Sequence, residues 1–298
     1  IVRQAGAGQR VSRYEFSLAQ KEIEWVKRLN RLGMAYFRPL LMAILKKCDQ
    51  SNQRVKIFKE IERFVFVVFR LTQTRSHYRS SEFSNAVRAI DRGDMGLSEL
   101  RERLRARMSF TFTDSGHFAA DDFYLLLQKR FENGQGYYGW PGLRYFLYEY
   151  ELGLLSGSRQ KKVDWADLLK TPKDKISIEH IYPQSETVAW QPAFGDIPKR
   201  DREAYRNSLG NLLLLSSAIN SSLQNDSFAE KKAPKINRDG TKLRNGYADG
   251  SHSEIEVSQY DKWGPDEIHE RGIRLLKFME RRWDISFADD QVREGLLF

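Results

Sequence analysis

Apolar residues recur every three to four positions over much of the first 170 residues, which is the spacing of a helix with one buried face. The run from 18 to 47 shows this spacing, although Pro39 is expected to kink or interrupt it. A second run, from 54 to 72, is apolar on most faces and predicts a buried helix. The same pattern predicts four further helices, over residues 82–91, 97–107, 121–131 and 141–154. Residues 1–170 therefore predict an all-helical domain.

The pattern changes after Pro172, where short β-favouring stretches replace the long amphipathic runs. We expect two strands, a helix capped by Ser216 or Ser217, a polar loop and a closing helix, over residues 176–178, 211–215, 216–220, 231–250 and 265–282. Strand, loop, strand and helix is the order of a ββα unit. The predicted fold class is mainly α with a small α+β part: a helical domain, 1–170, followed by a second domain, 171–298.

Charge divides the chain in the same way. Residues 1–170 hold 30 Lys and Arg against 19 Asp and Glu, a net charge of +11, whereas residues 171–298 hold 19 against 21, a net charge of −2. A basic domain of this kind favours a polyanionic partner. The candidate phosphate contacts are four arginines at alternate positions, Arg101, Arg103, Arg105 and Arg107. The alternative is a solvated helix face whose arginines pair with acids of the same domain.

Composition and cysteine count exclude several classes of protein. Hydrophobic residues make up 41% and aromatic residues 12% of the chain, enough for a packed core. The longest purely apolar run, residues 64–69, is too short to span a bilayer, and no secretory leader is present. Cys48 is the only cysteine, which excludes an internal disulfide and a Cys-x-x-Cys zinc site. We expect a cytoplasmic protein without a membrane partner, and the start at Ile1 predicts a piece of a longer polypeptide.

The segment that indicates chemistry is Glu179-His180-Ile181-Tyr182-Pro183, with Asn211 and Asn220 further along the chain. A histidine with an ordinary pKa is mostly neutral at pH 7 and can take a proton from water. A hard divalent cation prefers oxygen ligands and binds through one or two protein groups plus a phosphate. Because neighbours on a strand point to opposite faces, Glu179 and His180 can share a pocket only where the strand ends or twists. Pro183 marks such an end.

Each of these residues also has a structural explanation. A lone histidine is more often structural than catalytic, Asn220 is placed to partner a helix cap, and Asn211 is placed in a turn. Their order, their spacing and the strand–strand–helix context together favour a phosphodiester-hydrolysing site. A second possible cluster fits a polar loop and a helix cap better than a metal site: Asp114, His117, Asp121 and Asp122.

Several spaced motifs between residues 171 and 285 resemble known nucleases. The sequence Glu-His-Ile-Tyr-Pro-Gln-Ser from Glu179 is similar to that of HNH, or His-Me finger, endonucleases, and the nine-residue step from Asn211 to Asn220 matches the HNH domains of CRISPR effectors. More narrowly, the chain resembles the C-terminal domain of GmrSD/SspE-type modification-dependent restriction proteins. The motifs that carry this resemblance are Ile178–Gln184, Trp190, Leu209–Leu215, Asn220–Lys231, Trp263 and Trp283.

The resemblance implies a ββα-metal (His-Me finger) HNH nuclease domain in residues 171–298. It gives His180 the role of general base and Asn211 that of orienting the base. Glu179 and Asn220 become the metal ligands. An asparagine at the third motif position favours Mg²⁺, with Mn²⁺ as the alternative, over softer transition metals. The basic residues expected to contact nucleic acid here are Lys231, Lys232 and Lys235, although a charged loop explains this run equally well.

The resulting hypothesis is a Mg²⁺-dependent endonuclease that nicks DNA as the effector of a phage-defence restriction protein. Its partners would be double-stranded phage DNA and an upstream NTPase and modification-sensing domain of the same polypeptide, for which residues 1–170 contain no Walker motif. Two alternatives stay open: a non-catalytic DNA-binding or interaction module with a degenerate HNH fold, and an RNase.

Overall fold

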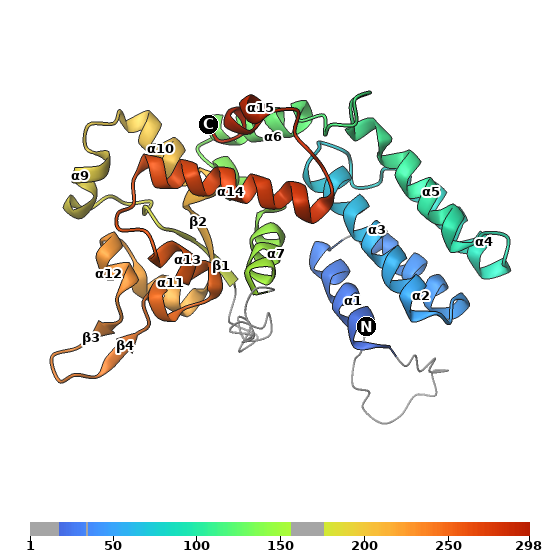
Figure 1. Ribbon diagram of the computed structural model, residues 1–298, viewed down its shortest axis with the longest axis horizontal. Helices are drawn as coiled ribbons and strands as arrows, with labels where there is room; N and C mark the ends of the chain where they lie inside the picture. The colour runs from blue at the N-terminus through green and yellow to red at the C-terminus, as the bar shows by residue number, and fades with distance from the viewer. Residues whose placement is uncertain (1–17, 34, 156–175) are drawn as a thin grey trace. The chain divides into compact units, whose positions relative to one another are not determined.

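The computed structural model describes residues 18–33, 35–155 and 176–298 (Figure 1). Contacts between residues divide the chain into two compact units, of which the first comprises 1–62 with 77–105 and the second 63–76 with 106–298. The domain boundary expected from the sequence, at residue 170, lies outside the described residues and stays a prediction.

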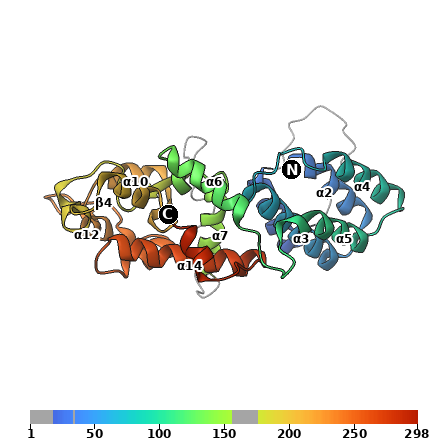
Figure 2. The same cartoon turned by 90° about the horizontal axis from the view of Figure 1, so that it is seen from above.

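The first unit is helical. Its elements are α1 (Gln20–Leu32), the short 3₁₀ turn η1 (Ala35–Phe37), α2 (Arg38–Lys47), the first part of α3 (Ser51–Arg70), α4 (Ser80–Arg92) and most of α5 (Leu97–Met108). Gly33 ends α1 in the left-handed region, with φ 77°, and Pro39 lies in the first turn of α2, where its missing N–H costs no intrahelical bond. The expected interruption of the 18–47 run is therefore confirmed. Helices α2 to α5 lie beside one another (Figure 2).

The second unit places two short strands among helices. The helices before the strands are α6 (Asp121–Glu132), the 3₁₀ turn η3 (Gly136–Gly139) and α7 (Leu143–Leu155). Strands β1 (Ile176–His180) and β2 (Leu212–Ser216) pair antiparallel, with Glu179 opposite Leu213 and His180 opposite Leu212. Helix α11 (Ser217–Leu223) follows β2 directly.

Further short elements surround this pair of strands. Between the strands the chain forms η4 (Val188–Trp190), α9 (Gln191–Phe194), α10 (Lys199–Asn207) and η5 (Leu209–Asn211). After α11 come α12 (Phe228–Lys232), the small hairpin of β3 (Lys235–Ile236) and β4 (Lys242–Arg244), η6 (Tyr247–Asp249), α13 (His252–Ser258), α14 (Pro265–Trp283) and α15 (Asp290–Gly295). The β3–β4 hairpin extends from the rest of the second unit (Figure 1).

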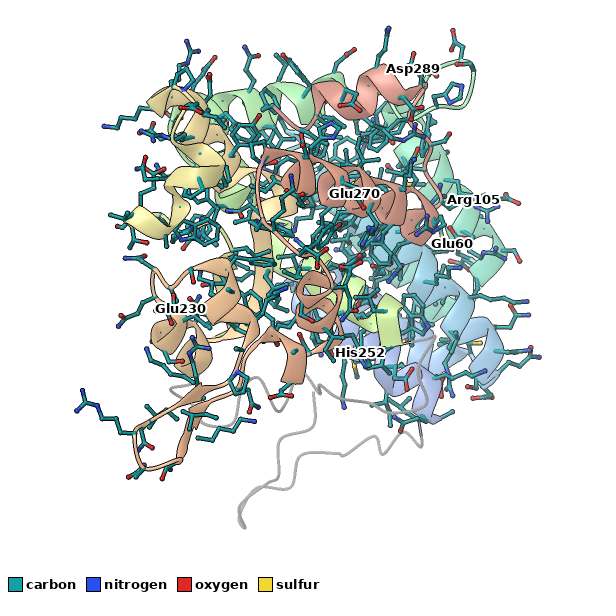
Figure 3. The ribbon with its side chains drawn as sticks, turned by 60° about the vertical axis from the view of Figure 1, so that its left-hand side comes forward. Glu60, Arg105, Glu230, His252, Glu270 and Asp289 are labelled. Atoms are coloured by element: carbon teal, nitrogen blue, oxygen red, sulfur yellow. The ribbon has the colours of Figure 1, made fainter. Side chains whose placement is uncertain are left out.

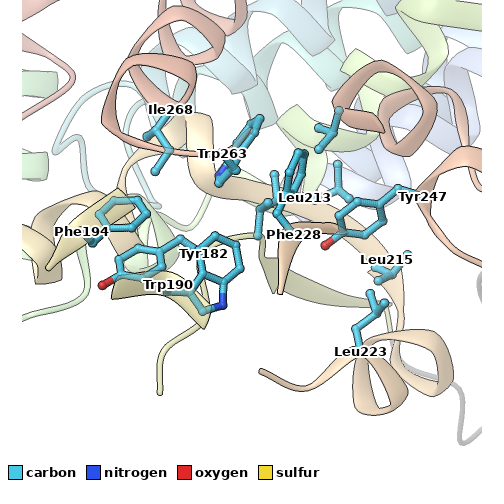
Figure 4. Packing of buried hydrophobic residues seen from close by; sticks show 12 residues of the cluster. Tyr182, Trp190, Phe194, Leu213, Leu215, Leu223, Phe228, Tyr247, Trp263 and Ile268 are labelled. Carbon is cyan, nitrogen blue, oxygen red and sulfur yellow. The ribbon is translucent and has the colours of Figure 1, made fainter. Parts of the chain in front are cut away.

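An aromatic core fixes the turn after β1 (Figure 4). Tyr182 stacks on Phe194 with ring centroids 3.7 Å apart and lies 5.4 Å from Trp190, and all three side chains are buried. Trp263 and Leu213 belong to the same cluster. These residues come from the turn after β1, from β2, η4 and α9, and from the segment before α14, so their packing fixes the strand ends to the surrounding helices.

The closing helix α14 packs directly on η5. A Cβ atom at Gly210 would lie 1.8 Å from the carbonyl oxygen of Ile268, so only glycine permits this approach. From α14 the fully buried Arg271 donates hydrogen bonds to the carbonyl oxygens of Gly210 and Leu212, at 2.6 and 2.9 Å. This contact fixes the start of β2 and, through the strand pairing, the end of β1.

The expectation of a mainly helical chain with a small β component is confirmed, and each helix expected from periodicity is present to within three residues. The expectation of a loop over 231–250 is wrong, because that segment contains the end of α12, the β3–β4 hairpin and η6. None of the described helices combines the length and the apolar character needed to span a bilayer.

Candidate active site

Asn211, the last residue of η5 just before β2, holds the turn that follows His180. Its Oδ1 accepts hydrogen bonds from the backbone N–H of Tyr182, at 2.7 Å, and from Nε1 of Trp263, at 3.0 Å. Its Nδ2 donates to the carbonyl oxygens of Tyr182 and Arg206, both at 2.9 Å. The side chain thus uses its full hydrogen-bonding capacity on the framework. The resemblance gave Asn211 the task of orienting His180, and the structure shows it positioning the backbone two residues beyond that histidine.

His180 is the last residue of β1, and its side chain is 7% exposed. The ring lies 4.9 Å from the ring of Tyr138, at an interplanar angle of 42°. Burial lowers the pKa of His180 to about 4; the interaction with the Asn207 side chain opposes this shift, whereas the charges of Lys231 and Arg206 act in the same direction as burial. The imidazole is therefore neutral at pH 7 in this environment.

The groups around the His180 ring leave its tautomer open. The Asn207 Nδ2 donates to the carbonyl oxygens of Gly134 and Glu203, at 3.1 and 3.3 Å. Nε2 of His180 is buried and has no hydrogen-bond partner in the described part of the chain, so no described group fixes whether this nitrogen carries the proton.

Glu179 faces a different set of side chains. Its Oε1 accepts a hydrogen bond from Lys231 Nζ, at 2.6 Å, and one from the hydroxyl of Tyr247, at 3.1 Å. Lys231, on α12, is fully buried, and its ammonium also donates to the carbonyl oxygens of His180 and Ile181, at 3.0 and 3.1 Å. All three N–H donors of Lys231 thus act inside the protein. The structure buries this lysine against β1 and the turn after it, whereas the sequence predicted a phosphate contact.

The pair of Glu179 and Lys231 is electrostatically costly to bury. Burial raises the pKa of Glu179 and lowers the pKa of Lys231, and in both cases the partner's charge acts against the shift. Burial also raises the pKa of Tyr247 far above its usual range, which keeps its hydroxyl protonated as a donor to Glu179. Such a pair persists only where geometry and additional hydrogen bonds satisfy both groups, as the three bonds of Lys231 do here.

Asn220, on α11, lies on the same face of β1 as Glu179. Its Nδ2 donates to Ser177 Oγ, at 2.9 Å, and to the carbonyl oxygen of Ile178, at 3.1 Å, and Ser177 is two positions before Glu179 on the strand. This orientation leaves Asn220 Oδ1 and Glu179 Oε2 without a hydrogen bond from any described residue. One carboxylate oxygen and one carbonyl oxygen are the ligands that Mg²⁺ takes while keeping its waters. The donor set therefore fits such a cation.

No described group of three or more His, Cys, Asp and Glu side chains lies close enough to hold a metal. A site with four protein ligands of the zinc type is therefore not formed among residues 18–33, 35–155 and 176–298. The alternative cluster at Asp114 and His117 is likewise not assembled: His117 hydrogen-bonds to Ser286, at 3.3 Å.

The side chains of Glu179 and His180 point to opposite faces of β1. The hydrogen bonds and ring contacts made by the side chains of Glu179 and His180 share no residue in the described part of the chain. This follows from the alternation of side chains along a strand. The structure thus places Glu179 and Asn220 on one face of β1, and places His180 beside Tyr138 and Asn207, next to the turn where β1 ends.

The arginines of α5 are occupied by acids of their own unit. Arg101 and Arg105 both pair with Glu60, at 3.3 and 2.7 Å, and Arg103 pairs with Glu99, at 2.7 Å; Glu60 and Arg105 are labelled in Figure 3. Partial burial would raise the pKa of Glu60, but Arg105 and Arg101 together lower it. Arg107 also has an interaction partner. The arrangement matches the alternative of a self-paired helix face, and DNA contact by these arginines stays a prediction.

The remaining basic candidates lie near α12. Lys232 donates to the carbonyl oxygen of Tyr260, at 2.8 Å. Lys235 lies on the exposed strand β3, 3.8 Å from Asp226, and is therefore accessible to a ligand. Of the three lysines expected to contact nucleic acid, Lys235 is the one that the structure leaves exposed.

Three residues around the site were not predicted from the sequence: Tyr138, Asn207 and Tyr247. Asn207 lies four residues before Asn211, so an asparagine ahead of the Leu-Gly-Asn motif was an available signal. Tyr138 and Tyr247 lie far from the motifs in sequence and reach the site only through folding.

Comparison with protein families matches residues 126–278, a little over half of the chain, to the family described as GmrSD restriction endonucleases, C-terminal domain. The matched segment contains β1, β2 and α11, with Glu179, His180, Asn211 and Asn220. Neither the curated proteins nor the solved structures provide a match.

Proposed function

We propose that this chain, which belongs to the family of GmrSD restriction endonuclease C-terminal domains, is a Mg²⁺-dependent DNA endonuclease. It would nick one strand at a time. The observation that carries this proposal is the family match, because it includes the histidine, the glutamate and both asparagines of the candidate site. We further propose that the chain is the effector part of a restriction protein whose modification-sensing NTPase domain belongs to the same polypeptide.

His180 would act as the general base. Its unprotonated Nε2 takes the proton from a water whose oxygen attacks phosphorus, and the bond from phosphorus to the 3′ oxygen breaks. This step requires the tautomer with its proton on Nδ1, because only then does Nε2 have a lone pair that can accept. The pKa of about 4 makes the free ring a weak base, and a DNA phosphate next to it would raise that pKa.

Glu179 and Asn220 would hold Mg²⁺ through their unbonded oxygens. When bound, the cation supplies charge stabilisation for the phosphate and the departing oxygen. Because His180 and Glu179 lie on opposite faces at the end of β1, the proposal requires the scissile phosphate to lie over that end of the strand. Asn211 contributes by fixing the turn there, and Lys231 contributes by fixing the Glu179 carboxylate from below.

One observation favours a second function. The ion pair with Lys231 already satisfies Glu179 without a metal, as expected of a structural carboxylate. A non-catalytic DNA-binding module with a degenerate nuclease fold would retain this pair and bind DNA through phosphates alone, with an affinity that falls steeply with salt.

Supercoiled plasmid separates the two functions. We expect the parent protein to convert it to open circles with Mg²⁺ or Mn²⁺ and not with EDTA. His180→Ala should slow nicking by about 10²- to 10⁴-fold, the contribution of a general base. His77→Ala is the matched control, because His77 is exposed in the first unit, and it should nick like the parent.

Equal nicking by His180→Ala and the parent would remove His180 from the chemistry. Salt-sensitive DNA binding without cleavage under any metal would instead support the non-catalytic module. An RNA transcript of the same sequence, incubated in parallel, decides between a DNase and an RNase.

A further inference from the structure

A cavity of about 330 Å³ lies beside His180 in the second unit. Its polar lining comes from η3 and the residue before it, from the chain after β1, and from α10: Gln135, Tyr138, Gln184, Glu203, Arg206 and Asn207. Two of these residues, Tyr138 and Asn207, contact the His180 ring directly. The cavity is therefore adjacent to the base that the proposed function uses, on the face of β1 opposite Glu179.

The cavity offers hydrogen-bonding groups that the protein itself does not use. Gln184 is exposed, and its carboxamide has no partner among the described residues. Gln135 accepts one bond from Arg130 through Oε1, at 3.1 Å, which leaves its amide nitrogen available. Tyr138 lines the cavity, is 45% exposed, and has a hydroxyl that bonds to no described residue.

The charge of the lining argues against a phosphate as the occupant. Glu203 and Arg206 contribute one charge of each sign, and Arg206 is already engaged by Glu186, at 3.5 Å, and by the hydroxyl of Tyr182, at 3.2 Å. Phosphate sites in DNA-binding proteins are instead rich in free Arg and Lys. An exposed aromatic ring together with free carboxamides is the chemistry that binds nucleobases, through stacking and through paired hydrogen bonds to base edges.

We propose that this cavity receives one nucleobase of the DNA, turned out of the stack, while the adjacent phosphate lies at His180. The base would stack on Tyr138, and the carboxamides of Gln184 and Gln135 would contact its edge. This inference rests on the proposed function for the identity of the ligand as DNA. It adds a subsite that positions the strand and gives the enzyme a preference for bases that leave the stack at low cost, as mismatched or unpaired bases do.

Binding without metal tests the subsite independently of cleavage. Saturation-transfer NMR on the full chain in EDTA compares the four deoxynucleoside monophosphates with deoxyribose 5-phosphate. We expect transfer to the base protons and no binding of the sugar phosphate. Tyr138→Ala should weaken nucleotide binding by about 5- to 150-fold, the range spanned by the loss of one base–aromatic stack. Tyr124→Ala, at a tyrosine of 39% exposure on α6 outside this cavity, is the matched control and should bind like the parent.

Cleavage provides the second readout. Gln184 makes no described contact with His180, so Gln184→Ala should raise KM for plasmid nicking more than it lowers kcat. Equal binding of deoxyribose 5-phosphate, or unchanged nucleotide affinity in Tyr138→Ala, would overturn the subsite even if the protein nicks DNA. Base binding lost in Tyr138→Ala, together with a complete absence of cleavage, would retain the subsite and reject the nuclease.

Discussion

Replacing Lys231 by methionine tests whether this lysine serves the protein interior or the DNA. Its ammonium is fully buried, 2.6 Å from Glu179 Oε1, and donates to the carbonyl oxygens of His180 and Ile181. Methionine has nearly the same length and carries no charge. The substitution therefore leaves the Glu179 carboxylate buried, with the hydroxyl of Tyr247 as its remaining donor among the described residues.

Removal of one partner from a buried ion pair costs about 3–5 kcal/mol, because the other charge stays buried and uncompensated. For a unit of this size each kcal/mol lowers Tm by about 2–4 °C, so Lys231→Met should lower it by about 6–20 °C. The double variant Lys231→Met with Glu179→Gln removes both charges. It should be more stable than Lys231→Met alone, since a glutamine oxygen still accepts the bond from Tyr247.

Urea unfolding followed by tryptophan fluorescence provides the measurement. The second unit contains the buried Trp140, Trp190, Trp263 and Trp283, so most of the signal reports on the unit that holds the pair; Trp25 lies in the first unit. EDTA is included because a cation at Glu179 would compensate for part of the lost charge. Lys232→Met is the matched control: its ammonium bonds to the carbonyl oxygen of Tyr260, and its loss should cost about 1 kcal/mol.

The sequence-based assignment predicts the opposite result. If Lys231 contacts a phosphate, Lys231→Met should unfold at the same urea concentration as Lys232→Met. Its DNA affinity should then fall, and the slope of log K against log salt should become flatter by about 0.9. That outcome would refute the buried pair and return Lys231 to the DNA-binding surface.

Three further predictions follow from the same contacts. Asn220→Ala should lose metal affinity and nicking together, and excess Mg²⁺ should restore part of the rate in a metal titration; full activity at ordinary Mg²⁺ would remove Asn220 from the site. Burial raises the pKa of Glu254 from 4.5 to about 7, so ionisation of this carboxyl lowers the stability of the folded protein as pH rises between these values. Glu254→Gln should therefore be more stable than the parent by up to about 3 kcal/mol at pH 8 and equally stable near pH 4. A difference in Tm that does not change with pH would contradict this. Arg101→Gln with Arg105→Gln should leave the salt slope of DNA binding unchanged, since both arginines pair with Glu60, whereas a slope flatter by about 1.8 would show that they face DNA.

Hydrophobic periodicity predicted the long helices because each buries a continuous apolar face. Helix α14 illustrates this: Ile268, Leu275, Leu276 and Met279 lie on its buried side, and the helix begins at Pro265 as expected. Helix α10 shows the limit. It has nine residues, none of them fully buried, and so provides no apolar pattern to detect. The β3–β4 hairpin was equally hard to predict from the sequence, because its strands are two and three residues long within a polar stretch.

The candidate site was predictable in part for a related reason. Strand alternation puts Glu179 on the same face of β1 as Ser177, and that much follows from the sequence; the hydrogen bond to Ser177 then places Asn220 on this face. The burial of Lys231 does not follow from spacing. A lysine in a basic, polar stretch is normally a surface residue, and only the tertiary contact with a buried carboxylate reverses that expectation.

Asn211 shows how a residue of the sequence motif acts through tertiary contacts. The resemblance assigns it the orientation of His180, yet its side chain bonds to the backbone of Tyr182 and to the carbonyl oxygen of Arg206. The first contact fixes the chain just after His180, and the second fixes Arg206, the residue before Asn207. The described hydrogen bonds of Asn211 thus go to the framework around the imidazole and not to the imidazole itself. If Asn211 orients the histidine, as the resemblance implies, it would do so through the backbone that carries it.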